Sequence, residues 1–394
     1  MNIKLSNDFS NPILISAFVL AFIEPPSLLY LAISGSGIWW YLHALFRILQ
    51  FFSLSVAFII TLPKKKQRID VFSLLLFTYL FFLVITNFVN GGVISAVLYY
   101  VNIVITMLLL TKYYIRINKF KEYITVFNFW IVLFTIINFL TLLLFPEGLF
   151  IDLRNWPQWF FGNRNAFIFQ FYICLTISTI YSFIIYGKLK SWYYGLVLLM
   201  VISEIMGGSV TSTIAIAVVV FLTLFLRKFN ISTQLACKCT LIGALFLSYF
   251  IISIGVNSSI GELIEIYLNR SLTFSGRTVI WSSAINSMQN HFWLGLGWTD
   301  IPLNWNWDVQ QCHNTFLDML FVGGVLLLFL FILLMFVSLK NLYKNKNVYV
   351  RCIFSSIFIG YCIVFLMEAR RLDIGFFLFL VMMFYSSRIN KCII

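Results

Sequence analysis

Two side chains that could do chemistry together lie in the long polar segment 257–313 of an otherwise apolar chain. Arg277 stands near the start of "SGRTVIWSSAINSMQNHFWLGLGW" (275–298), and His313 stands in "QQCHNTF" (310–316). A guanidinium group binds phosphate oxygens in bidentate fashion, whereas an imidazole exchanges protons near neutral pH. We therefore predict an active site in which Arg277 binds a phosphate and His313 accepts a proton. The structural alternative is that Arg277 pairs with an acid and that His313 only anchors the segment by hydrogen bonding.

The elements that must position these residues are membrane-spanning helices. Of the 394 residues, 61% are hydrophobic and 10% are charged, a composition that excludes an ordinary soluble globule. Apolar stretches of roughly 20 residues match the hydrocarbon core of a bilayer. We expect a single all-α integral membrane domain over 1–394, without a cleavable signal peptide. Its spans, about twelve, are expected near 12–32, 38–62, 69–89, 93–111, 123–145, 166–186, 192–208, 209–226, 235–256, 314–339, 348–367 and 372–387.

The basic residues predict the orientation of these spans. Most of them lie in the short connections, which places those connections and both termini in the cytoplasm. The net charge of +13 therefore indicates topology rather than nucleic-acid binding. The cysteines form no metal-binding pattern, and we expect no metal and no cofactor. The basic segments are 63–68, 112–122, 187–191, 227–234, 340–347 and the tail after 387.

Two long external segments remain, 146–165 and 257–313, and loops of this length are usually functional. In the larger one, between the ninth and tenth spans, apolar residues from Val279 to Phe292 recur at helical spacing. This pattern predicts an amphipathic helix at the outer membrane–water boundary, with Arg277 at its N-terminus. Gly295 and Gly297 then allow a tight reversal, so that the segment forms a cap over the active site.

The outer face carries arginine and no lysine, which suggests a need for planar, permanently charged groups. The alternative is pairing with acids such as Glu147, Asp152, Glu262 and Glu368. Trp305 and Trp307, in the polar run "NWNWD", offer apolar ring faces to sugars, although packing in the loop explains them equally well. Around Arg277 and His313 we predict a substrate-binding set: Arg154, Arg164, Arg270, Arg370, Arg47, Asn314, Trp305 and Trp307.

Arg47 lies inside the second span, where an unpaired charge costs roughly 2.5–3.5 kcal/mol. His43, Arg47 and Gln50 share one helix face, which should point into the bundle. Glu24, at a similar depth in the first span, is the predicted ion-pair partner of Arg47. The alternative is that Arg47 binds lipid phosphates.

The motifs "SGRTVIW", "GLGW", "HNTF" and "VGG" follow one another in this order. Together they resemble the signature of the O-antigen ligase/polymerase family, bacterial integral membrane enzymes that transfer lipid-linked glycans. "PEGLF" followed by "FFGNRN" resembles a segment of the Wzy-type polysaccharide polymerases, which act on capsule, exopolysaccharide or O-antigen repeat units. The resemblance covers about residues 145–340.

The resemblance implies a metal-independent glycosyltransferase that uses undecaprenyl-pyrophosphate-linked oligosaccharide on the outer face of the bacterial cell membrane. In it, Arg277 corresponds to the family's loop arginine, Arg270 to a second basic position and His313 to its histidine. Family members often carry an arginine in an "SRT"-like segment that opens a span, whereas this chain reads "GGSVTST" (207–213). That phosphate role could pass to Arg164, Arg154 or Arg370. The usual proline before the glycine pair is also missing, since the chain reads "HFWLGLG".

Several functions stay open at this point. Polymerase is favoured by "PEGLF" and "FFGNRN", and ligase-type transfer to a lipid or wall acceptor is the alternative. A flippase for the same lipid is a second alternative, but the chain shows no internal repeat and its polar groups cluster outside the spans. A flippase and a chain-length regulator of the same pathway are possible protein partners.

Overall fold

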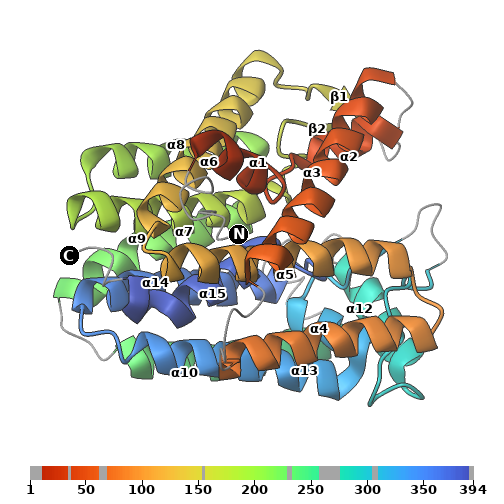
Figure 1. The fold of residues 1–394 in the computed structure, drawn as a ribbon. Coiled ribbons are helices and arrows are strands. Elements are labelled where there is room, and N and C mark those ends of the chain that lie inside the picture. Colours follow the sequence, from red (N-terminus) through yellow and green to blue (C-terminus); the bar gives the residue numbers. More distant parts are fainter. Residues whose placement is uncertain are drawn as a thin grey trace.

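The computed structural model describes residues 11–33, 37–61, 69–152, 156–228, 233–256, 276–303 and 309–389. These residues form a bundle of helices with one two-stranded hairpin, so the all-α membrane fold class is confirmed (Figure 1). The short antiparallel strands β1 (Phe150–Ile151) and β2 (Pro157–Gln158) lie at the same end of the bundle as helix α12 (Arg277–Met288).

Eight helices of the described part are long and apolar enough to cross a membrane. They are α3 (Gly37–Thr61), α4 (Val71–Val89), α5 (Ile94–Arg116), α6 (Phe120–Leu144), α7 (Phe167–Tyr186), α10 (Thr233–Val256), α13 (Thr315–Leu342) and α14 (Val348–Met367). Three of the other predicted spans are shorter apolar helices, α8 (Ser191–Gly207), α9 (Val210–Lys228) and α15 (Ile374–Ile389).

The first predicted span, near 12–32, is not one continuous helix. It is divided into α1 (Pro12–Leu20) and α2 (Pro26–Ile33), with a break at 21–25. Proline lacks the N–H that would continue the ladder of hydrogen bonds, and its ring clashes with the preceding turn. Pro25 and Pro26 therefore end the first helix, and Pro26 starts the second at the position that proline favours.

The break between α1 and α2 places Glu24 in a buried polar network. His43 Nδ1 donates to Glu24 Oε1 at 2.5 Å, and His43 Nε2 accepts from Arg47 Nε at 3.1 Å. The Arg47 guanidinium stacks on the ring of Tyr99, whose hydroxyl donates to Glu24 Oε2 at 2.9 Å. Gln50 completes the network by donating to Tyr99 and to Ala21 O. The polar face on α3 is as predicted, but His43 and Tyr99 stand between Glu24 and Arg47, which were expected to pair directly.

Two glycine motifs that lie far apart in the sequence meet in the structure. Helix α13 is interrupted at Gly323 and Gly324, and Gly324 has φ +63°. The reversal after α12 fills this interruption: Leu296 N donates to Phe321 O at 2.7 Å, and Val325 N donates to Phe292 O at 3.0 Å. Gly295 and Gly297 have φ +66° and +78°, so the predicted reversal is confirmed.

This contact leaves no room for side chains. A Cβ on Gly295 would lie within 2.6 Å of three backbone atoms of the α13 interruption, and one on Gly324 would meet the backbone of Trp293 and Leu294. At this point the external segment is therefore held against α13 by backbone-to-backbone contact.

We expect Gly324→Ala to lower the apparent Tm of the purified protein by roughly 5 °C or more, because alanine disfavours positive φ and its Cβ would overlap backbone. Differential scanning fluorimetry in detergent measures this. Gly195→Ala in α8 is the matched control, since a Cβ there meets nothing within 4 Å. The control should be neutral or slightly stabilising, because alanine is the better helix former. Equal losses in the two variants would contradict the backbone contact.

Candidate functional site

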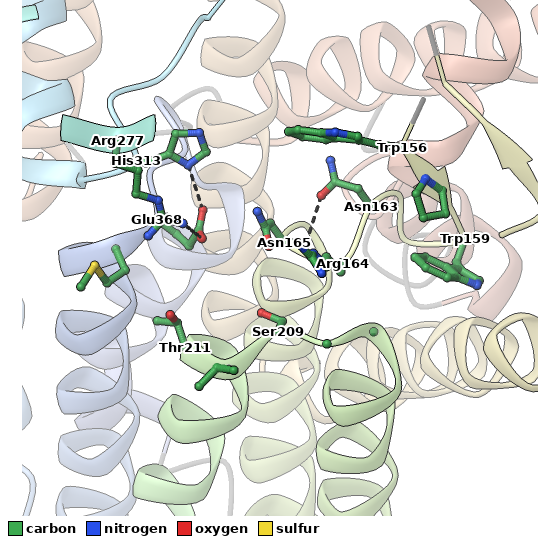
Figure 2. Close-up of a pocket in the computed structure, with 15 residues that line it drawn as sticks. Trp156, Trp159, Asn163, Arg164, Asn165, Ser209, Thr211, Arg277, His313 and Glu368 are labelled. Atoms are coloured by element: carbon green, nitrogen blue, oxygen red, sulfur yellow. Dashed lines mark hydrogen bonds and ion pairs between the residues drawn. The ribbon is translucent and has the colours of Figure 1, made fainter. Parts of the chain in front are cut away.

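A cavity of about 700 Å³ opens at the end of the bundle where the predicted outer segments gather (Figure 2). Three parts of the chain line it: the smaller external segment, the turn between α8 and α9, and the group formed by the start of α12, the start of α13 and the end of α14. The residues that matter below are Trp156, Trp159, Asn163, Arg164, Asn165, Gly207, Gly208, Ser209, Arg277, His313 and Glu368.

The centre of the site is one carboxylate with two basic partners. Arg277 Nη2 donates to Glu368 Oε1 at 2.6 Å, and His313 Nδ1 lies 3.2 Å from Glu368 Oε2 (Figure 2). The Glu368 side chain is buried, whereas those of Arg277 and His313 are partly exposed. When Nδ1–H donates to a carboxylate, the neutral imidazole has its lone pair on Nε2. His313 is thereby arranged to accept a proton through its other nitrogen.

The sequence places these three groups at the ends of helices. Arg277 is the first residue of α12, after Gly276 with φ +86°. Glu368 is the C-cap residue of α14, and its carbonyl oxygen accepts from Thr315 Oγ1 at 2.9 Å. The fully buried Trp281 of α12 donates from Nε1 to Cys312 O at 2.8 Å. These contacts join α12, α13 and α14 directly behind the pair of basic side chains.

Asn314 was expected to bind substrate, but its side chain holds the start of α13. It is fully buried, and its Oδ1 accepts from Leu317 N at 3.0 Å as the N-cap of the helix. Its Nδ2 donates to Ser248 Oγ and to Leu366 O. Both the oxygen and the nitrogen of the Asn314 amide are therefore bonded to atoms of the protein itself. The preceding His313 has φ +49°, in the left-handed region that few non-glycine residues adopt.

The opposite wall of the cavity comes from the smaller external segment. Trp156 is 43% exposed, and the buried Trp159 donates from Nε1 to Phe145 O at 2.8 Å. Asn138 of α6 fixes this segment, because its Oδ1 accepts from Phe161 N at 2.8 Å. Ser27 of α2 fixes it from the side by donating to Phe160 O. Two indole rings and the amides of the "GNRN" turn thus line one side of the cavity.

Arg164 is exposed in this wall and has no acidic partner among the residues that the structure describes. Its guanidinium lies over the α8–α9 turn, with Nη1 3.4 Å from the position of a Cβ on Gly208. That turn is the "GGSVTST" segment, in which the sequence lacks the expected arginine. Arg164 therefore brings a guanidinium to the same turn from another part of the chain.

Like Asn314, two further predicted ligands do not line the cavity. Arg370 stacks on Phe169 at 5.1 Å and lies near Asp373. Burial raises the pKa of Asp373 to about 6, and Arg370 opposes that shift. Arg47 belongs to the α3 network. Arg154, Arg270, Trp305 and Trp307 lie outside the described residues.

Two residues near the site were not singled out from the sequence as candidate site residues. Glu368 was considered only as an ion-pair partner for an arginine, and its bond to His313 was not foreseen. The signal available was an acid directly before two basic residues in "MEARRLD" (367–373). His291 is a second histidine of the large external segment. It is exposed just after α12 and does not line the cavity.

Arg371 is buried, in contrast to the arginines of the cavity. Its Nη2 donates to Thr299 O at 2.7 Å, and its Nε lies 3.7 Å from Asp318 Oδ2. Arg371 thus pairs with an acid, as Arg277 does, and its bond to Thr299 O secures the large external segment.

Comparison with known protein families identifies the same region of the chain. Residues 195–332 match the family model described as O-antigen ligase. The matched region includes the α8–α9 turn, α12, both glycine motifs and His313. No curated protein matches the chain significantly. Residues 195–332 of this multi-pass membrane protein are thus similar to the O-antigen ligase family.

Proposed function

We propose that the chain is a polysaccharide polymerase that transfers undecaprenyl-pyrophosphate-linked oligosaccharide repeat units to a growing glycan on the outer face of the bacterial cell membrane. One observation carries the proposal: Arg277 and His313 line one cavity and share one buried carboxylate. An anion-binding group beside an oriented imidazole is what glycan transfer from a lipid pyrophosphate requires. Both termini would be cytoplasmic, and a flippase and a chain-length regulator would be partners.

The arginines would bind the pyrophosphate of the donor. A pyrophosphate leaving group needs neutralisation of charge rather than a proton, and fixed guanidinium groups supply this without reorganisation. Arg277 and Arg164 reach the cavity from different walls, so they could hold the two phosphates between them. The donor would compete with Glu368 for Arg277. Arg154, Arg270 and Arg370 stay proposals as further ligands.

His313 would act as the general base. Its Nε2 takes the proton of the acceptor hydroxyl while that oxygen forms a bond to the anomeric carbon of the donor sugar. The bond from this carbon to the phosphate oxygen breaks, and the pyrophosphate leaves with the electron pair. Attack opposite the leaving group inverts the anomeric centre. Glu368 would orient the imidazole and stabilise the imidazolium that forms.

The wall with Trp156 and Trp159 would bind the glycan. Indole rings present apolar faces to sugar rings, and the amides of Asn163 and Asn165 can bond hydroxyl groups. This wall is the segment whose "PEGLF" and "FFGNRN" motifs favour a polymerase. Trp305 and Trp307 stay proposals as part of the same surface.

Ligase-type transfer to a lipid or wall acceptor uses the same chemistry, and a flippase would move the lipid without chemistry. Membrane vesicles supplied with a defined lipid-linked repeat unit separate the three. Chain lengthening supports the proposal. Transfer of the whole glycan to another acceptor indicates a ligase, and movement without a new product indicates a flippase.

We expect His313→Gln to reduce polymer formation about 10²–10⁴-fold, the range for loss of a general base. Binding of the donor lipid should persist, because it depends on the arginines. Single-turnover assays with labelled donor and equilibrium binding measure the two effects. More than about a tenth of the native rate would contradict the role of base. Loss of donor binding would instead assign His313 to substrate binding.

We expect Arg277→Lys to lose most activity while the protein still accumulates in the membrane, because an ammonium group cannot form the paired bonds of a guanidinium. The affinity for inorganic pyrophosphate, measured by calorimetry, should fall with the activity. Near-normal polymer yield would show that Arg277 serves only as the cation of Glu368.

We expect Glu368→Gln to lower the turnover rate at least about 10-fold, because the amide neither stabilises an imidazolium nor fixes the Nδ1–H tautomer. Its pH–rate profile should differ in shape from that of the native enzyme. Glu122→Gln is the matched control, since Glu122 pairs only with Lys119 at the start of α6 among the described contacts and is half-exposed. A Glu368→Gln enzyme with the native rate and pH profile would contradict the orienting role.

A further inference from the structure

A second acid, Asp318, lies behind the histidine of the site, in the first turn of α13. It is fully buried and does not line the cavity. Its Oδ1 accepts from Cys312 N at 2.9 Å, six residues earlier in the chain. Cys312 directly precedes His313, so one oxygen of this carboxylate bonds to the backbone beside the proposed base.

The peptide groups on both sides of Cys312 are held by buried side chains. Asp318 accepts from the N–H of Cys312, and Trp281 of α12 donates from Nε1 to its C=O at 2.8 Å. Cys312, Asp318 and Trp281 are all fully buried. With both peptide groups fixed, the direction in which the chain continues into His313 is fixed as well.

His313 needs this support because its backbone has an uncommon conformation. Its φ of +49° lies in the left-handed region, and a non-glycine residue stays there only where the surrounding contacts impose it. The backbone conformation sets the direction of the side chain. In this direction Nδ1 of the imidazole lies 3.2 Å from Glu368 Oε2, and the ring faces the cavity.

The other oxygen of Asp318 faces a cation. Arg371 Nε lies 3.7 Å from Oδ2, and both side chains are buried. This distance is too long for a hydrogen bond, so the pair is joined by charge. Arg371 also donates from Nη2 to Thr299 O at 2.7 Å. The acid that bonds to Cys312 is therefore compensated by an arginine that bonds to the large external segment.

We propose that Asp318 is a positioning residue for His313, which holds the backbone of Cys312 and thereby aims the imidazole into the cavity. Glu368 holds the ring, and Asp318 holds the chain that carries the ring. Arg371 compensates the charge of Asp318. The competing interpretation is that Asp318 serves only as the counter-ion of Arg371. The proposal rests on the role of His313 given above, but the placement of the imidazole is measured without a transfer assay.

Two double variants separate the bond to Cys312 from the ion pair. The Asn variant, Asp318→Asn with Arg371→Met, keeps an oxygen that can accept from Cys312 N. The Leu variant, Asp318→Leu with Arg371→Met, has a side chain of similar shape without that oxygen. Both lack the ion pair and the bond to Thr299, and neither leaves an unpaired buried charge. The two proteins thus differ in one hydrogen-bond acceptor.

Nitrogen-15 NMR with magic-angle spinning, on the full-length protein in lipid with labelled histidine, reports the imidazole directly. The chain has three histidines, and His313→Gln assigns the signals of His313. At a pH where the ring is neutral, the native protein and the Asn variant should show the Nδ1–H tautomer of His313. The Leu variant should show an average of both tautomers, because the ring no longer stays on Glu368. A native signal in the Leu variant would overturn the proposal, as would loss of the signal in both variants.

The same two variants give a kinetic test. The kcat of polymer formation should be about 10–100-fold lower in the Leu variant than in the Asn variant, the effect of a misplaced reacting group. Their affinities for inorganic pyrophosphate, measured by calorimetry, should be equal. Equal kcat values would overturn the positioning role, and so would loss of pyrophosphate binding in the Leu variant alone. If the native protein transfers no glycan, the proposed function fails and the NMR result alone decides the role of Asp318.

Trp281→Phe tests the same support with every charge kept, and it applies if the double variants do not accumulate. Phenylalanine keeps an aromatic ring in the core but lacks the N–H that bonds to Cys312 O. We expect the tautomer signal of His313 to weaken and kcat to fall, while pyrophosphate affinity stays native. A native NMR signal and a native kcat in Trp281→Phe would overturn the claim that the held peptide groups of Cys312 aim His313.

Discussion

The carboxylate of Glu368 accepts from Arg277 and His313, which begin or precede two different helices, while it ends a third. Ion pairs of this kind, with one partner buried, bind strongly only when their geometry is fixed, because desolvation opposes the attraction. Here the geometry is fixed by Trp281 bonding to Cys312, by Thr315 bonding to Glu368 O, and by the Asn314 cap. Removing Glu368 would leave two basic groups beside each other, so the site depends on this one acceptor.

The rest of the fold holds the surroundings of this acceptor in place without entering the chemistry. The external segment is attached to α13 through the paired glycine motifs, and to the turn between α14 and α15 through Arg371, which is bonded to Thr299 O. The opposite wall is attached to α6 through Asn138 and to α2 through Ser27. Pro25 and Pro26 impose the break after α1, and this break brings α2 against that wall. The cavity lies between two separately anchored walls.

Composition and hydropathy were sufficient to predict a membrane bundle, and the polar segment was sufficient to single out Arg277 and His313. Composition and hydropathy could not predict the break in the first span. A hydropathy value averaged over a window of residues hides two prolines in an apolar run. The face of α3 follows from helical spacing, but the insertion of His43 between Glu24 and Arg47 depends on how helices pack. Glu368 and His313 are far apart in the chain, and only the tertiary fold brings them together. The capping role of Asn314 was not predicted for a related reason, since a cap and a ligand use the same amide.

The central claim is that the donor pyrophosphate binds in this cavity at Arg277. A cryo-electron microscopy structure with a non-transferable lipid-pyrophosphate analogue tests it most directly. The account predicts phosphate density within hydrogen-bond distance of Arg277 and Arg164, the Glu368 carboxylate displaced from Arg277, and the sugar between His313 and Trp156. Phosphate density at the Arg47–Tyr99 network, with the bond between Arg277 and Glu368 intact, would contradict it.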